Sequence, residues 1–292
     1  MSWTGKSKGN TLGYGIFIKV LQVFGVMPAY FLLRFVAGYY FLFSRKSNKH
    51  ILYFLRERLG YKGFAAYREL YSNYYWFGQA LIDRIVMMSG IKNKLTFNFD
   101  DEVYFKQMIA GGKGGLLLSA HLGNWEIAGH LLEKRMTTRI NIVMYDNERQ
   151  NLKQYLEGIT GRRNANIIVI KDNLSHIYEI MEALGNNEFV CMHADRFLPG
   201  NKTLKADFLG KTAIFPSGPF VLASKLEVPV SFVFAMKNTH THYHFYASPG
   251  VVYRGSGKSS PEQIADEFTK AMEEKARLYP AQWYNYYPFW QE

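Results

Sequence analysis

The segment Gly114-Gly-Leu-Leu-Leu-Ser-Ala-His-Leu-Gly-Asn-Trp-Glu126 is the strongest indication of architecture in this chain. Its apolar run Leu116–Ser119 is typical of a strand buried on both faces, as in a parallel sheet. Gly123 and Asn124 follow as a short turn, and residues 125–135 have the composition of a helix. A strand that leads through a turn into a helix is the basic unit of α/β proteins.

The same alternation continues on both sides of this segment. Further predicted strands are Lys94–Phe99, Ile140–Tyr145, Ile167–Ile170, Phe189–Met192, Val228–Ala235 and Thr241–Ala247. Further predicted helices are Asn48–Leu59, Tyr67–Ser89, Glu102–Ala110, Asn151–Leu156, Leu174–Leu184, Pro219–Leu226 and Pro261–Leu278. The pattern predicts an α/β fold with a mostly parallel or mixed central sheet flanked by helices.

Residues 13–43 are apolar and aromatic, but charges and a proline interrupt them. Lys19 and Arg34 limit the longest uncharged run to Val20–Leu33, which is shorter than the roughly 20 residues of a spanning helix. Pro28 is expected to break or kink the helix. We therefore expect two amphipathic helices that lie on or dip into a membrane. A pair of ordinary helices packed on the domain is the alternative.

The composition favours a membrane surface as a partner and disfavours nucleic acid. Aromatic residues make up 16% of the chain, and the formal net charge is +11. Rings with polar tips suit a membrane–water boundary, and positive charge attracts anionic lipids or an acidic carrier. No dense basic run and no nucleic-acid-binding signature is present. The single cysteine, Cys191, fits a reducing compartment, and its apolar neighbours predict a buried structural thiol.

His121 lies where the predicted strand ends, which is the edge at which α/β sheets place reactive groups. Glu126 begins the next helix five residues later, and a strand–turn–helix junction can turn the two side chains toward each other. A carboxylate on one imidazole nitrogen fixes the tautomer and leaves the other nitrogen as a general base. The residues alone also allow a structural histidine that only makes a hydrogen bond.

The motif Ser-Ala-His-Leu-Gly-Asn-Trp-Glu126 resembles the catalytic motif of the late lipid A acyltransferases. It is also similar to that of the phosphatidylinositol mannoside acyltransferases and, more distantly, to the His-x-x-x-x-Asp motif of the glycerolipid acyltransferases. Similar segments follow in the family's order, namely Phe189–Arg196, Ala206–Lys211, Phe215–Gly218, Val228–Val230 and Pro280–Trp283. In the third of these, Ser217 replaces the glutamate of the glycerolipid branch, so a phosphate-binding role is not carried over.

The resemblance covers residues 13–290 and implies a glycerolipid-acyltransferase-like fold. Together with the apolar stretch that ends at Phe43, it predicts a membrane-associated helical segment over residues 1–43 and an acyltransferase domain over residues 44–292. The activity implied is that of an O- or N-acyltransferase, which takes a fatty acyl chain from a thioester of acyl carrier protein or coenzyme A.

The acceptor implied is the hydroxyl or amine of a membrane lipid or glycolipid, with lipid A-type biosynthesis as the expectation. The enzyme would work at the cytoplasmic face of the bacterial inner membrane as a monotopic or single-pass protein. Beyond the thioester donor, no cofactor and no metal is expected.

In this interpretation His121 is the general base and Glu126 orients it. Backbone amides of residues 122–124 would stabilise the oxyanion of the intermediate. The predicted substrate-binding residues are Asn124, Trp125, Arg163, Asp195 and Arg196.

Other interpretations stay open. A thioesterase or lipid hydrolase could use the same pair with water as the acceptor, and a non-catalytic membrane-surface protein could keep both residues for structure. His240, His242 and His244 alternate along a predicted strand and would share one face, where they could bind a metal. Because no carboxylate or cysteine lies close in sequence, the exposed polar face of an edge strand is preferred.

Overall fold

A computed structural model of the protein describes residues 11–89, 91–124, 127–128, 138–145, 166–171, 173–253 and 260–290. The helices are α1 (Thr11–Phe24), α2 (Val26–Phe43), α3 (Arg45–Tyr53), α4 (Gly63–Ser89), α5 (Glu102–Ala110), α8 (Ser175–Gly185), α9 (Ser217–Lys225) and α10 (Pro261–Leu278). A π-helical turn, Phe54–Arg58, continues α3, and a 3-10 turn, Pro280–Gln282, follows α10.

The strands are β1 (Thr96–Phe99), β2 (Gly115–Ser119), β3 (Ile140–Tyr145), β4 (Asn166–Ile170), β5 (Phe189–His193), β6 (Thr203–Phe208), β7 (Lys211–Pro216), β8 (Pro229–Lys237), β9 (His242–Ala247) and β10 (Val251–Val252). The predicted helix over Asn151–Leu156 and most of the one after Asn124 lie outside the described residues.

The predicted α/β fold is confirmed. The main sheet has the order β1-β9-β8-β2-β5-β3-β4, and β10 pairs with β8. Among the described strands, the pairings of β8 with β9 and with β10 are antiparallel, and the other pairings in this sheet are parallel. β2 lies between β8 and β5, and all of its residues are buried. Its uninterrupted apolar sequence is what such a central parallel strand requires.

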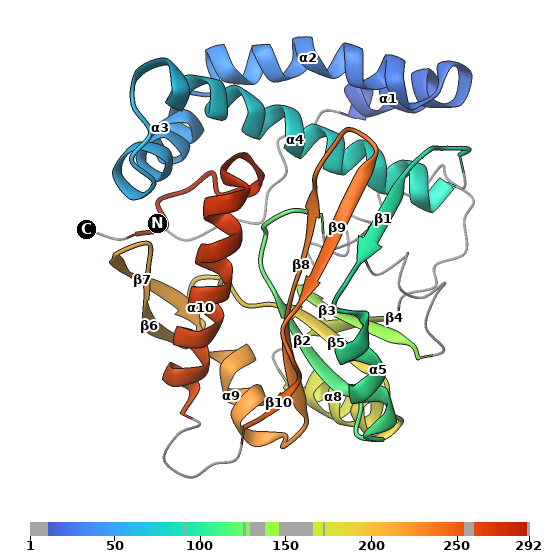
Figure 1. Ribbon diagram of the computed structural model, residues 1–292, viewed down its shortest axis with the longest axis vertical. Helices are drawn as coiled ribbons and strands as arrows, with labels where there is room; N and C mark the ends of the chain where they lie inside the picture. Colours follow the sequence, from blue (N-terminus) through green and yellow to red (C-terminus); the bar gives the residue numbers. More distant parts are fainter. Residues whose placement is uncertain are drawn as a thin grey trace.

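Helices cover both faces of the sheet (Figure 1). One face packs against α8, α9 and α10, where the rings of Phe220 and Phe268 lie 5.7 Å apart. The other face packs against α5 through Phe105. Side chains alternate along each strand, so Leu118 of β2 enters the first core and Leu117 enters the second.

A separate antiparallel hairpin, β6–β7, is not predicted by the local pattern. Its two-residue turn, Leu209–Gly210, has positive φ at both positions. Hairpins with this turn usually carry Asn-Gly or Asp-Gly, so Leu-Gly gives no recognisable signal. The hairpin packs on the C-terminal segment, where Trp290 Nε1 donates to Phe208 O at 3.1 Å.

The two predicted N-terminal helices are present, but the chain breaks at Gly25 and not at Pro28. Gly25 has φ 80, a conformation that favours glycine. Pro28 lies in the first turn of α2, where a missing N–H group leaves no hydrogen bond unmade.

Helix α2 lies along α4 (Figure 1) and buries Ala29, Tyr30, Leu33 and Ala37. By length and composition it could cross a membrane, and it is the one described helix of which this holds. Helices α1, α2 and α4 share one small core, which contains Leu21, Leu33 and Ile82. Helix α2 belongs to the predicted N-terminal segment and α4 to the predicted acyltransferase domain, and the two pack together. The domain boundary at residue 43 stays a prediction.

Candidate active site

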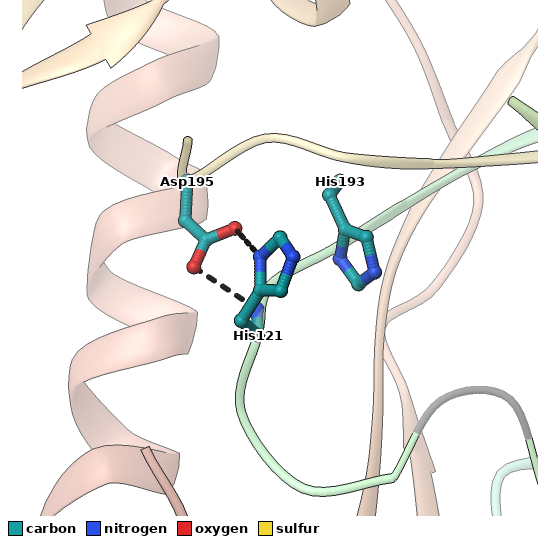
Figure 2. A group of neighbouring side chains, drawn as sticks. All are labelled: His121, His193 and Asp195. Carbon is teal, nitrogen blue, oxygen red and sulfur yellow. Dashed lines mark hydrogen bonds and ion pairs between the residues drawn. The ribbon is translucent and has the colours of Figure 1, made fainter. Parts of the chain in front are cut away.

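His121 follows β2 at the carboxyl edge of the sheet, and Asp195 follows the neighbouring strand β5. The parallel register pairs Ser119 with His193 and so brings the two strand ends together. His121 Nδ1 lies 2.8 Å from Asp195 Oδ1, and the His121 backbone N–H donates to Asp195 Oδ2 at 3.0 Å (Figure 2). One carboxylate therefore fixes both the ring and the backbone of His121.

The surroundings of Asp195 keep this carboxylate ionised. Its burial acts to raise the pKa, but the charge and hydrogen bond of His121, together with the charge of Arg196, hold the pKa of Asp195 below its usual value. An ionised carboxylate can only accept, so Nδ1 of His121 carries the proton and Nε2 is the basic nitrogen. The His121 side chain is 18% exposed, so a substrate can reach it.

His193, which the sequence motif does not single out, stacks on His121. The ring centroids lie 4.1 Å apart at an interplanar angle of 26° (Figure 2). Burial, with the nearby charge of His121, holds the pKa of His193 well below its usual value, so its imidazole is neutral. Its place two residues before Asp195 is visible in the sequence. Its contact with His121 depends on the register of β2 and β5, which no local pattern gives.

The same three side chains could also hold a metal ion, since one ligand atom from each lies within 4.8 Å of the others. However, both oxygens of Asp195 already contact His121. This use of the carboxylate favours proton transfer over metal binding.

The turn after His121 is held by two segments that are distant in sequence. The N–H of Gly123 donates to Gln282 O at 2.9 Å, and the N–H of Asn124 donates to Ala235 O at 2.7 Å. Gly123 has φ 76, and a Cβ at this position would meet Ala235 O at 2.1 Å. Only glycine lets the turn approach β8 this closely.

Two of the donors predicted to stabilise an oxyanion, the amides of Gly123 and Asn124, therefore have other partners. Besides the backbone bonds of Gly123 and Asn124, the Asn124 side-chain Nδ2 donates to Ala80 O at 3.1 Å and to Tyr243 Oη at 3.2 Å. In this structure Asn124 anchors the turn to α4 and β9, and its contact with a substrate stays a prediction.

Arg196 lies beside the His121–Asp195 pair. Its Nη2 donates to Tyr284 O at 2.5 Å, and its guanidinium lies 5.8 Å from the centroid of the Tyr287 ring. Its contact with a substrate stays a prediction.

The remaining predicted site residues, Trp125, Glu126 and Arg163, lie outside the described residues, and their roles stay predictions. The sequence motif gives Glu126 the contact that orients His121. Among the described residues, the carboxylate on His121 Nδ1 is that of Asp195.

The three alternating histidines each have a different partner. His242 Nδ1 lies 2.8 Å from Thr96 Oγ1, His244 Nε2 lies 3.3 Å from Asp100 Oδ2, and His240 contacts Gln79. The prediction of an edge strand is wrong, because β9 lies between β1 and β8. Its parallel partner β1 comes far earlier in the chain, so this pairing leaves no local signal.

A cavity of about 40 Å³ lies on the α5 face of the sheet. Its lining is almost wholly apolar and includes Phe105, Leu117, Ile142, Cys191, Val233 and Phe245. Ser119 and Ala235 also line it, so the cavity begins next to the turn that carries His121. Burial raises the pKa of the Cys191 thiol to about 12, and the prediction of a buried thiol is confirmed.

Comparison with known proteins gives a family match over nearly the whole chain. A protein-family model described as bacterial lipid A biosynthesis acyltransferase matches residues 7–292. Two phosphatidylinositol mannoside acyltransferases of Mycobacterium tuberculosis, from strains CDC 1551 / Oshkosh and ATCC 25618 / H37Rv, are each 26% identical to the chain over 192 residues. The match covers 62% of this chain and 56% of each relative, so the chain spans little more than half the length of these relatives.

Proposed function

Because this chain belongs to the bacterial lipid A biosynthesis acyltransferase family, we propose that it transfers a fatty acyl group from a thioester to a hydroxyl or amine of a lipid. The observation that carries the proposal is the hydrogen bond between His121 Nδ1 and Asp195 at the carboxyl edge of the sheet. A partly exposed imidazole that is oriented by a buried carboxylate is the arrangement of a general base.

In the proposed reaction, His121 Nε2 takes the proton of the acceptor as the acceptor oxygen or nitrogen attacks the thioester carbonyl carbon. Asp195 stabilises the imidazolium that forms. The tetrahedral intermediate then collapses, the carbon–sulfur bond breaks, and the thiolate takes the proton back from Nε2. The sequence motif predicts that Glu126 also orients the ring of His121.

The acyl donor that we propose is a thioester of acyl carrier protein or coenzyme A. Both carry negative charge, which the net charge of +11 attracts. The small cavity beside the turn after His121 is the proposed site of the end of the acyl chain, because cavities with an almost wholly apolar lining stay dry and accept hydrocarbon. No metal and no other cofactor takes part in this scheme.

The proposed acceptor is a lipid A-type glycolipid precursor at the cytoplasmic face of the bacterial inner membrane. Support for the membrane location comes from a row of exposed apolar side chains that we call the α2 face, which consists of Met27, Phe31, Phe35, Tyr39, Leu42 and Phe43. The α2 face points away from α4, and the exposed basic residues Arg34, Arg45 and Lys46 lie within or beside it. Apolar and basic groups together suit the surface of an anionic membrane, so we propose a monotopic arrangement with α2 in the plane of the membrane.

The test uses the purified full chain, acyl carrier protein thioesters and a bacterial lipid extract, with mass spectrometry of the products. The wild-type protein should give acylated lipid. His121→Ala should lower the rate by on the order of 10²–10⁴ and leave the melting temperature unchanged within about 3 °C.

His242→Ala is the matched control, because it removes a partly exposed imidazole whose ring contacts Thr96 outside the site. Near-normal turnover by the His121 variant would refute the mechanism. Free fatty acid in place of acylated lipid would instead support the thioesterase alternative.

A further inference from the structure

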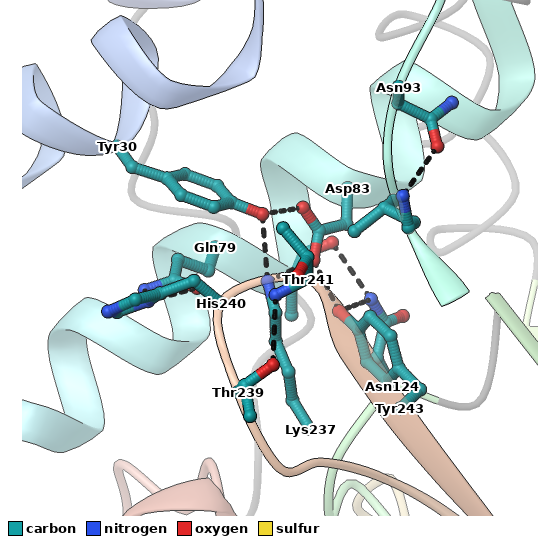
Figure 3. Close-up of polar contacts among 12 residues, drawn as sticks. Tyr30, Gln79, Asp83, Asn93, Asn124, Lys237, Thr239, His240, Thr241 and Tyr243 are labelled. Atoms are coloured by element: carbon teal, nitrogen blue, oxygen red, sulfur yellow. Dashed lines mark hydrogen bonds and ion pairs between the residues drawn. The ribbon is translucent and has the colours of Figure 1, made fainter. Parts of the chain in front are cut away.

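A buried cluster of polar side chains lies between α2 and the catalytic turn (Figure 3). Its centre is Asp83 of α4, which is fully buried. Lys237 Nζ and the Tyr243 hydroxyl each donate to Asp83 Oδ2 at 2.5 Å, and the Tyr30 hydroxyl donates to Oδ1. Lys237 Nζ also donates to the Tyr30 hydroxyl at 2.8 Å. Side chains from α2, α4, β8 and β9 thus converge on one carboxylate.

Stability alone does not account for this cluster. Taking an ammonium and a carboxylate out of water is costly, and apolar replacements of such pairs are often neutral or stabilising. Burial lowers the pKa of Lys237, although the charge of Asp83 opposes that shift, so the surroundings disfavour the charged ammonium. A role in fixing geometry is the best-attested reason for keeping a buried pair of this kind.

The hydroxyl group of Tyr243 connects the cluster to the turn after His121. The Tyr243 hydroxyl donates to Asp83 and accepts from Asn124 Nδ2 at 3.2 Å. Asn124 stands three residues after His121. The side chain of Asn124 also donates to Ala80 O of α4, one helical turn before Asp83.

The backbone of Lys237 supports the same turn from its other side. Its N–H donates to Gln282 Oε1 at 2.9 Å, and its carbonyl accepts from Gln282 Nε2 at 2.7 Å. The carbonyl of Gln282 in turn accepts from the N–H of Gly123 at 2.9 Å. The turn is therefore tied to both ends of the Asp83–Lys237 pair.

We propose that Asp83 and Tyr243 are positioning residues, which hold the turn after His121 so that the imidazole keeps its contact with Asp195. Their hydrogen bonds described above reach the turn through Asn124 and Lys237. The inference rests on the proposed acyl transfer. A misplacement of about 1 Å can cost on the order of 10² in rate, so a small shift of this turn is enough to matter.

Tyr243→Phe is the sharpest test, because it removes the shared hydroxyl and leaves the Asp83–Lys237 pair in place. Tyr253→Phe is the matched control. Tyr253 is a buried tyrosine whose hydroxyl donates to Glu267 Oε2 at 2.5 Å, on α10 and away from the turn. Both variants should lose similar melting temperature. Only Tyr243→Phe should lower kcat, by at least about 10-fold, with KM changed less than about 2-fold.

A second pair of substitutions addresses Asp83 itself. Asp83→Asn alone leaves the Lys237 charge buried without a carboxylate, which destabilises the fold. Asp83→Asn combined with Lys237→Met removes both charges, and it should fold and lower kcat as Tyr243→Phe does. Adding Tyr243→Phe to Asn124→Ala should lower kcat little further, because Asn124→Ala already removes the hydrogen bond between Asn124 and the Tyr243 hydroxyl.

Hydrogen exchange separates this inference from the proposed function. The amides of Gly123 and Asn124 should exchange faster in Tyr243→Phe than in Tyr253→Phe, whatever reaction the protein catalyses. If the wild-type protein transfers acyl groups and the two tyrosine variants have equal kcat, the positioning role is wrong. If the wild-type protein is inactive, the proposed function fails, and equal exchange in the two variants then refutes the positioning role as well.

Discussion

The two oxygens of Asp195 contact different parts of one residue. Oδ1 accepts a hydrogen bond from Nδ1 of the His121 ring, and Oδ2 accepts one from the His121 backbone N–H. A neutral amide has a single acceptor oxygen, so asparagine could satisfy one of these donors and would present N–H groups to the other. The geometry of His121 thus depends on a carboxylate at position 195.

Asp195→Asn is expected to lower kcat by on the order of 10²–10⁴, because the amide can donate to Nδ1 and favour the wrong tautomer. Steady-state kinetics with a thioester donor measures the loss. Asp207→Asn is the control, since the Asp207 carboxylate contacts Thr212 on the exposed face of the β6–β7 hairpin. Equal kcat in the two variants would mean that Asp195 does not orient the base.

The low pKa of Asp195 determines the direction in which kcat/KM should change with pH. The carboxylate is ionised throughout pH 5–9, so the acid limb of kcat/KM should report His121, and the rate should rise with pH to a plateau as the imidazole loses its proton. In Asp195→Asn the imidazolium loses its negative neighbour, so the midpoint of this limb should move to lower pH. A midpoint that does not move would contradict this coupling.

Single residues also differ in how far the sequence could predict them. His121 is recognisable because its motif is continuous in the chain. Asp195 is recognisable as a site residue, but its partner is not, because the contact depends on the register of β2 and β5. Asp83 gives a weaker signal, a carboxylate within an apolar helical stretch, and its partners Lys237 and Tyr243 lie more than 150 positions away.

At the scale of elements, the turn between β2 and the next helix shows how backbone geometry limits sequence. Gly123 combines a positive φ with close contact to β8, whereas Gly112 has φ 71 and nothing within 4 Å of a Cβ. Alanine substitutions at these two positions therefore distinguish the cost of backbone strain from the cost of a steric clash.

Gly112→Ala should lower the free energy of unfolding by about 1–2 kcal/mol, the cost of an alanine in the left-handed region. Gly123→Ala should lower it by roughly 3 kcal/mol or more, because the clash with Ala235 O adds to that cost. Urea denaturation measures both values. Similar losses would show that the turn can move away from β8.

Strand β5 separates two kinds of core. Cys191 faces the apolar cavity, and its neighbour Val190 faces the core under α8, α9 and α10. Cys191→Leu fills part of the cavity and should shift the preferred donor toward shorter acyl chains. Val190→Leu enlarges a side chain on the opposite face and should leave the preference unchanged. Competition between donors of different chain length, read by mass spectrometry, gives the comparison; equal preferences would exclude this cavity as the acyl site.

At the scale of the whole molecule, the α2 face lies opposite the side of α2 that packs on α4. Phe31 and Phe35 are 60% and 65% exposed, and the centroids of their rings lie 5.5 Å apart. Apolar rings exposed in a row along a helix are stabilised when they enter a lipid surface.

Phe31→Ser with Phe35→Ser should weaken binding to anionic phospholipid vesicles by at least about 10-fold, since each ring contributes on the order of 1 kcal/mol or more when buried. Vesicle co-sedimentation measures the change. Tyr178→Ser, at an exposed aromatic of α8, should bind as the wild type does. Equal binding by both variants would place the membrane contact elsewhere.

Much of the fold follows from local pattern. The predicted bounds of α10 match the structure, because Pro261 and the capping box of Ser260 and Gln263 mark its start. The apolar runs of β2 and β3 are similarly clear. The place of β9 in the sheet and the β6–β7 hairpin depend on pairing between segments and on an unusual turn, so the one-dimensional pattern carries no trace of them.

The hydrogen bond between Gly123 and Gln282 has a consequence for biosynthesis. On the ribosome, His121 and Asp195 emerge long before Gln282 leaves the exit tunnel. Until Gln282 has been synthesised, the nascent chain lacks this hydrogen bond to the turn after His121. A chain truncated before Gln282 should therefore hold the turn after His121 less firmly than the full chain does.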